Sequence, residues 1–190
     1  MPPVTLALLG VNVAVFMLQM SGGMGLVEHF GLWPGREFAF WQLVTYAFLH
    51  GSLAHLFFNM LGLYMFGPEI ERLFGSRFFL FYYLAAVLAA ALTHLAMTGV
   101  MGGPAVPAVG ASGGLYGVLL AFGWYFPHRR VMLLIPPIPM SARTLVIVFA
   151  VVELFFGVTQ TNAGVAHFAH LGGMLGGWGM IEARRRGLLR

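Results

Sequence analysis

The sequence predicts an all-α polytopic membrane protein, folded as one bundle of six transmembrane helices. Two observations support this prediction. Of the 190 residues, 59% are hydrophobic and only 8% are charged, whereas a soluble domain carries about 25% charged residues. The hydrophobic residues also fall into six separate stretches, each near the ~20 residues that cross a ~30 Å hydrocarbon core.

The six stretches form a single domain over residues 1–190, separated by segments too polar or too rich in Gly and Pro to span. We expect the spans at residues 4–20, 52–73, 77–97, 111–126, 142–158 and 164–182. The segment 21–50 carries Trp33 and Trp41, which suits a loop in the headgroup layer. The start has no basic region of the kind that precedes a cleavable signal peptide, and a Pro-rich connector with Pro136, Pro137 and Pro139 precedes the fifth span.

The basic residues predict the orientation of the bundle. All ten are Arg, and only Arg36 lies in the alternate set of loops. The others flank the second and fourth loops or follow the last span, at positions 72, 77, 129, 130, 143, 184, 185, 186 and 190. Because basic residues favour the cytoplasmic side, both termini are expected there. In a bacterium, the membrane would be the cytoplasmic one.

Composition also excludes several kinds of chemistry. There is no Cys, hence no disulfide, thiol nucleophile or Cys-ligated metal. There is no Asp, which excludes a two-aspartate intramembrane protease, and no His-Glu-x-x-His zinc motif. We expect no metal and no cofactor. The net charge of +4 does not indicate nucleic-acid binding, because the Arg residues lie at helix ends.

Four polar residues on three spans fall at one depth in the membrane. Counted at 1.5 Å per residue from the cytoplasmic Arg residues, Ser112, His170, His55 and Asn59 lie roughly 20–26 Å up. Polar side chains in hydrocarbon are costly and usually face a cavity. The coincidence therefore predicts a shared polar site below the outer surface.

Small residues predict close contact between the fourth and sixth spans. Gly113 and Gly117 are four residues apart on one, as are Gly173 and Gly177 on the other. Pairs of small residues at this spacing allow membrane helices to approach closely. Such a crossing would bring the serine hydroxyl within hydrogen-bond distance of the histidine ring on the sixth span.

This pairing suits acyl transfer by a serine nucleophile. A neutral His170 can accept the proton of Ser112 and later donate it to the leaving amine. Tyr116, one turn further along, is expected to fix the plane of the His170 ring. The side chains of His55 and Asn59 and the backbone N–H of Ser112 are the expected donors to an oxyanion.

The motifs lie in the expected helices. They read Gly110-x-Ser112-Gly113, His55-x-x-x-Asn59, Ala169-His170-x-Gly172-Gly173 and Gly67-x-x-x-Glu71-x-x-x-Gly75. Together they resemble the rhomboid intramembrane serine proteases over the whole six-helix core. The resemblance implies a Ser–His dyad without an acidic third member, the oxyanion donors named above, and cleavage of transmembrane protein segments within the bilayer. One departure is Trp41-Gln42, where the family usually has Trp-Arg.

Other interpretations remain open. Glu153, the only acid well inside a span, can orient His170 as a third member, although a structural hydrogen bond within its own helix is the simpler expectation. His167 makes a metal-binding His pair conceivable. Six spans with buried polar groups also suit a transporter, and a non-catalytic relative would bind membrane clients.

Bulky apolar residues on the fifth span suggest how a substrate enters. Phe149, Leu154, Phe155 and Phe156 suit a lateral seal against lipid, with the segment 158–164 as a movable cap. The aromatic run at 78–83 on the third span is expected to face lipid or to pack at the surface.

Overall fold

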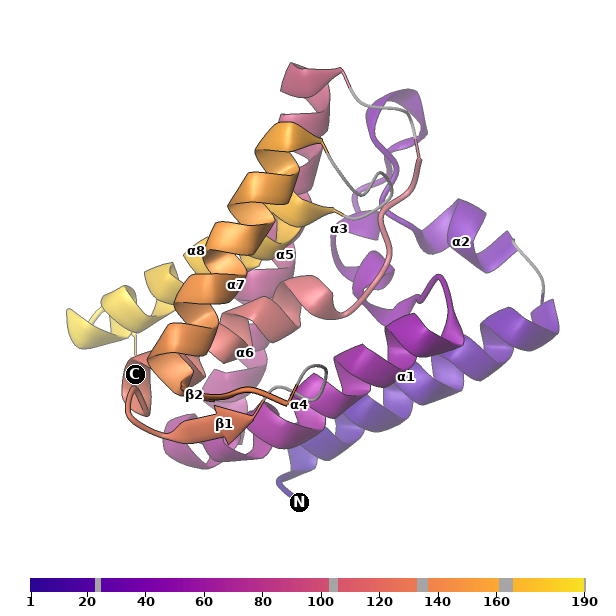
Figure 1. The fold of residues 1–190 in the computed structure, drawn as a ribbon. Coiled ribbons are helices and arrows are strands. Elements are labelled where there is room, and N and C mark those ends of the chain that lie inside the picture. The colour runs from indigo at the N-terminus through magenta and orange to yellow at the C-terminus, as the bar shows by residue number, and fades with distance from the viewer. Residues whose placement is uncertain (23–24, 103–105, 133–136, 161–165, 190) are drawn as a thin grey trace.

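The computed structural model describes residues 1–22, 25–102, 106–132, 137–160 and 166–189. The chain is a helical bundle, and six long helices stand where the six spans are expected (Figure 1). They are α1 (Pro3–Gly22), α4 (Leu53–Phe74), α5 (Ser76–Met101), α6 (Ser112–Tyr125), α7 (Ala142–Thr159) and α8 (His167–Arg185). The start of the sixth expected span, residues 164 and 165, lies outside the described residues.

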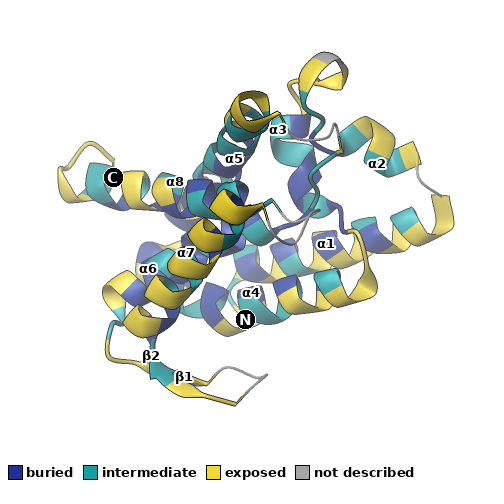
Figure 2. Cartoon of the chain, turned by 45° about the horizontal axis from the view of Figure 1, so that its top comes forward, coloured by how far each residue is buried: buried dark blue, intermediate teal, exposed yellow. Residues whose placement is uncertain are grey.

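Three helices among the described residues are long and apolar enough to cross a membrane by length and composition, namely α1, α5 and α7. Exposed residues run along the outer faces of α1 and α7 (Figure 2), and many of them are large and apolar. Such faces are stable against lipid and not against water. The prediction of an all-α membrane protein is confirmed, with one small hairpin as an exception.

Helix α6 occupies the middle of the bundle and contacts α4, α5, α7 and α8. It has 14 residues, about 21 Å of helix, and is too short to cross the ~30 Å core alone. Most of its residues are buried on all sides, as expected of a helix that is hydrophobic all round. The fourth predicted span therefore corresponds to a short, buried central helix, which is not long enough to cross the core by itself.

Most of the aromatic run at the start of α5 is core, and the expectation of an outward-facing surface holds only for Phe81, which is 53% exposed. Phe79, Tyr82 and Tyr83 are fully buried. Tyr82 Oη donates to the carbonyl of Gly117 at 2.7 Å, and Tyr83 Oη lies 3.5 Å from the carbonyl of Ala111. These hydroxyls can enter the core because α6 offers backbone acceptors there.

A buried carboxylate joins one end of α1 to the junction of α4 and α5. Glu71 is 1% exposed and accepts from Val4 N at 2.9 Å, from Thr5 N and Thr5 Oγ1 at 2.7 Å, and from Ser76 Oγ at 2.7 Å. The N–H groups of the first turn of α1 have no partner within their own helix. Glu71 supplies that partner and fixes the start of α1 against the end of α4.

The segment 21–50 is more than a surface loop. It holds α2 (Gly25–Phe30), η1 (Gly35–Glu37), α3 (Gln42–Thr45) and η2 (Tyr46–Phe48). Its inner part packs against the bundle, since Tyr46 is 3% exposed and its hydroxyl donates to the carbonyl of Val87 at 2.9 Å. The prediction of a loop confined to the headgroup layer therefore describes only the outer part.

Gln42 organises this segment from inside. Its side chain is 2% exposed. The amide oxygen accepts from the N–H groups of Trp33 and Ala39 at 3.1 and 3.2 Å, and the amide nitrogen donates to the carbonyls of His29 and Glu37 at 3.4 and 3.3 Å. A neutral amide at the position of the usual Arg thus ties four backbone groups together.

A two-stranded hairpin follows α6, in the Pro-rich segment that was predicted only to be a connector. Strand β1 (Arg130–Met132) pairs antiparallel with β2 (Pro139–Ser141). Pro136 lies outside the described residues. Near this end of the bundle, Arg129 pairs with Glu69 at 2.5 Å, and the Arg184 guanidinium lies 4.5 Å from the centre of the Phe78 ring. Arg129 after α6, Arg130 in the hairpin and Arg184 in α8 therefore lie at one end of the bundle.

Candidate active site

Close contact between α6 and α8 brings the two central side chains together. A Cβ on Gly173 would overlap the carbonyl oxygen of Gly113, and a Cβ on Gly177 would lie 3.2 Å from Gly117 Cα. The four glycines expected to form the crossing thus face one another in pairs. Because neither helix carries a side chain at these points, their backbones touch.

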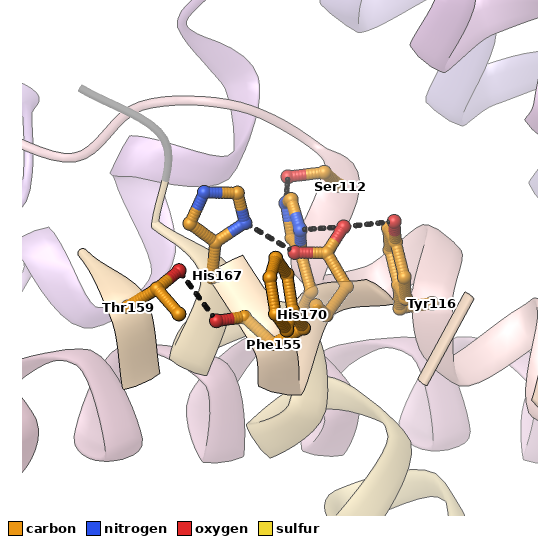
Figure 3. A network of polar contacts seen from close by, with 7 residues as sticks. Ser112, Tyr116, Phe155, Thr159, His167 and His170 are labelled. Atoms are coloured by element: carbon orange, nitrogen blue, oxygen red, sulfur yellow. Dashed lines mark hydrogen bonds and ion pairs between the residues drawn. The ribbon is translucent and has the colours of Figure 1, made fainter. Parts of the chain in front are cut away.

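At the head of this contact, Ser112 Oγ lies 2.8 Å from Nε2 of His170 (Figure 3). Ser112 is the first residue of α6, and its N–H is one of the first-turn amides without a partner in the helix. The Tyr116 ring stacks on His170, with centroids 4.3 Å apart and planes inclined by 3°. The stack fixes the plane of the imidazole.

A cavity of about 740 Å³ adjoins the pair. His55, Asn59, Ser112 and His170 all line it, so the four residues expected at one depth share one cavity. It continues between α4 and α7 along an apolar wall to β1. That wall includes Phe58, Met65, Leu119, Met132, Leu145 and Phe149.

Gly110 leaves room for His55 beside the serine. Its φ of +128° lies where residues with side chains are strained, and a Cβ there would lie 2.8 Å from His55 Nε2. The N–H of Gly51 points at His55 Nδ1 at 3.4 Å. Because Nδ1 then accepts, the neutral ring carries its proton on Nε2, the atom nearer Gly110.

The neighbours of His55 are polar but uncharged. Asn59 is 4% exposed, and one N–H of its amide donates to the carbonyl of His55 at 3.0 Å, which leaves a second N–H. His50 packs edge-on to His55 with ring centroids 5.1 Å apart. Burial and the nearby His55 lower the pKa of His50 to about 4, so its ring is neutral at pH 7.

Glu153 reaches the same site from α7, which corrects the expectation of a hydrogen bond within its own helix. Its Oε1 accepts from the hydroxyl of Tyr116 and lies 2.9 Å from Nδ1 of His170, although not in line with an ideal hydrogen bond. Its Oε2 lies 2.6 Å from Nδ1 of His167. The histidine therefore has an acidic neighbour that the motif resemblance did not include.

Glu153, His167 and His170 carry ligand atoms of the types that bind zinc, within 4.8 Å of one another. Two ligands on one tetrahedral zinc, with bonds of about 2.0–2.1 Å, stand roughly 3.3 Å apart. The separations of 2.6 and 2.9 Å are instead those of groups bound to each other. This geometry favours a proton-sharing cluster over a metal site.

The sequence did not single out Tyr82 and Tyr83, and it offered Glu153 as a partner of His170 only as an alternative. Tyr82 and Tyr83 hold α6 through backbone carbonyls, and no pattern distinguishes them from lipid-facing aromatics. Glu153 did carry a signal, because an ionisable residue inside a span usually has a partner there. Phe149 lines the cavity, whereas Leu154 and Phe155 point outward and are more than half exposed.

A family model for the Rhomboid domain matches residues 37–186. The chain belongs to the rhomboid family. It is 31% identical over 169 residues to rhomboid protease GluP of Bacillus subtilis, covering 86% of this chain and 31% of GluP. It is 32% identical over 196 residues to the mitochondrial Rhomboid protein 1 of Saccharomyces cerevisiae, covering 93% and 53%.

Rhomboid protease GlpG of Haemophilus influenzae is 29% identical over 191 residues, covering 96% of this chain and 92% of GlpG. The chain therefore spans about a third of GluP and half of the yeast protein. It spans nearly all of GlpG. The rhomboid fold is a helical membrane fold, and the helices described above place this chain in the same class.

Proposed function

We propose that this rhomboid-family chain is an intramembrane serine endopeptidase that cleaves transmembrane segments of other membrane proteins. The observation that carries the proposal is the 2.8 Å contact between Ser112 Oγ and His170 Nε2, at a cavity also lined by His55 and Asn59. The names of GluP and GlpG as rhomboid proteases support it.

The geometry suits a two-step acyl transfer. His170 Nε2 takes the hydroxyl proton while Ser112 Oγ attacks the peptide carbonyl carbon. The oxyanion meets the Ser112 N–H, His55 Nε2–H and the free N–H of Asn59. The imidazolium then protonates the departing amine, and an acyl-enzyme remains. Water attacks this ester, gives its proton to His170, and the serine leaves as an alcohol.

The cavity also suits the substrate class. Its apolar wall between α4 and α7 matches a transmembrane segment that enters from the side, and exposed Gly51 and half-buried His55 line the end from which water can enter. We place both termini and the Arg-rich end in the cytoplasm, with residues 1–190 as one domain of six membrane helices, of which α6 is the short central one. In a bacterium the protein would lie in the cytoplasmic membrane.

The test is labelling by a fluorophosphonate probe, which reacts with activated serines. We expect the purified protein in detergent to be labelled, and Ser112→Ala and His170→Ala to lose labelling. Ser21→Ala and His128→Ala serve as matched controls, because both residues are exposed and lie outside the cavity lining. Undiminished labelling of Ser112→Ala or His170→Ala would contradict the proposal, and a transporter or client-binding protein predicts no labelling at all.

Substitutions of two phenylalanines on α7 test whether this helix forms a lateral gate or only a lipid-facing surface. Phe149 lines the cavity and lies against Tyr116, with ring centroids 6.1 Å apart, whereas Phe155 is 60% exposed. We expect Phe149→Ala to raise the cleavage rate several-fold, because it widens the entry between α4 and α7. Phe155→Ala should change the rate little. Initial rates on one transmembrane substrate in proteoliposomes measure both, and equal effects would argue against a gate at Phe149.

A further inference from the structure

We propose that Glu153 is a positioning residue for His170: its carboxylate sets which ring nitrogen carries the proton and holds the imidazole against Ser112. The inference rests on the proposed function. It adds an acidic group to what the motifs describe as a dyad, and it assigns that group to α7, a helix that carries neither the serine nor the histidine.

The carboxylate contacts three side chains from two other helices. Its Oε1 is shared by the hydroxyl of Tyr116 and, at 2.9 Å, by Nδ1 of His170. Its Oε2 meets Nδ1 of His167 at 2.6 Å. Because Tyr116 also stacks on His170, one oxygen fixes both members of the stack. Tyr116 therefore covers one face of the His170 ring, and Glu153 lies against its Nδ1 (Figure 3).

This arrangement selects the reactive tautomer. An ionised carboxylate can only accept hydrogen bonds, so it favours a proton on Nδ1 of His170. Nε2 is then unprotonated and faces Ser112 Oγ at 2.8 Å, as a general base requires. When Nε2 takes the serine proton, both nitrogens carry hydrogen and the ring is positive. Glu153 stays ionised, and its charge stabilises the imidazolium.

Burial makes a purely structural role a poor explanation. Glu153 is 7% exposed, and a buried charge is expensive unless several groups satisfy it. Among the residues that the structure describes, the side-chain contacts of this carboxylate go to Tyr116, His167 and His170, and none goes to its own helix. A Gln could tie α7 to α8 equally well through neutral hydrogen bonds. What Gln cannot supply is the negative charge beside His170.

The test compares Glu153→Gln and Glu153→Asp with wild type, using Glu37→Gln as the matched control because Glu37 is exposed. For Glu153→Gln we expect kcat to fall about 100-fold, the lower end of what general acid–base groups contribute. KM should hardly change. The acidic limb of the pH–rate profile should move to lower pH, since the imidazolium loses its counter-charge. Glu153→Asp should keep the limb near its wild-type position, with a smaller loss of kcat.

Several results would overturn the proposal. One is an unchanged kcat in Glu153→Gln; another is a lower kcat with an unmoved pH profile, the signature of a structural role. If Glu153→Gln does not fold, Glu153→Asp provides the test. An acidic limb of its pH–rate profile that lies at lower pH than in wild type would contradict the proposal. Inactivation of wild type by EDTA would assign the carboxylate to a metal instead. Absence of cleavage and probe labelling in wild type would defeat the proposed function itself, so the two failures are distinguishable.

Discussion

Gly173→Ala is expected to destabilise the protein by about 3 kcal/mol or more, the upper end for overpacking a close contact. The added methyl group would overlap the carbonyl oxygen of Gly113, a backbone atom that cannot rotate away. Helices α6 and α8 must separate, and His170, one turn from Gly173, moves with α8. Because a displacement of about 1 Å can cost about 100-fold in rate, we also expect cleavage to fall by that factor.

The matched control is Gly179→Ala on the same helix. A Cβ at Gly179 would meet no atom within 4 Å, and Ala is a better helix former than Gly by about 1 kcal/mol. We therefore expect unchanged or slightly higher stability and full activity. Thermal unfolding in detergent and initial cleavage rates give both readouts. Equal stability of the two variants would show that the glycine contact does not hold the helices together.

Replacing Glu71 by Gln is expected to lower the free energy of unfolding by about 3 kcal/mol. Four donors meet its carboxylate at 2.7–2.9 Å, two at each oxygen, and an amide nitrogen in place of one oxygen would face two of them. A buried donor without an acceptor costs about 1–3 kcal/mol. The start of α1 should loosen first, because either Val4 N or Thr5 N loses its acceptor.

Glu69→Gln, two residues away, provides the comparison. Glu69 pairs with Arg129, and their side chains are 29% and 52% exposed, so the pair should contribute less than about 1 kcal/mol. Unfolding in detergent with increasing SDS separates the variants. If Glu69→Gln lost as much stability as Glu71→Gln, the buried hydrogen bonds of Glu71 would stabilise the protein no more than the exposed ion pair of Glu69.

The arrangement of the helices could be predicted where a pattern has one physical meaning. Long apolar stretches located both ends of each of the six helices to within four residues. The glycine pairs predicted the crossing of α6 and α8, since small residues at that spacing serve close approach and little else. The depths counted from the Arg residues predicted that His55, Asn59, Ser112 and His170 share one layer, and all four line one cavity.

Other features depend on contacts that no single stretch reveals. An aromatic run on a membrane helix can face lipid or the core, and only the carbonyls of α6 decide that Tyr82 and Tyr83 point inward. The connector after α6 pairs with itself because its two strands meet in register. Glu153 was noticed, but its partners lie 14 to 37 residues away, and that distance cannot be judged from one helix.

The order of the helices along the chain bears on how such a protein is made. During translation Ser112 enters the membrane well before the ribosome has produced Gly173 and His170, so its hydroxyl lacks the contact with the ring that the proposed mechanism uses as its base. That contact forms only when α8, the final long helix, packs against α5 and α6. On the proposed mechanism, a partly synthesised chain that lacks α8 would therefore be unable to cleave the membrane proteins around it.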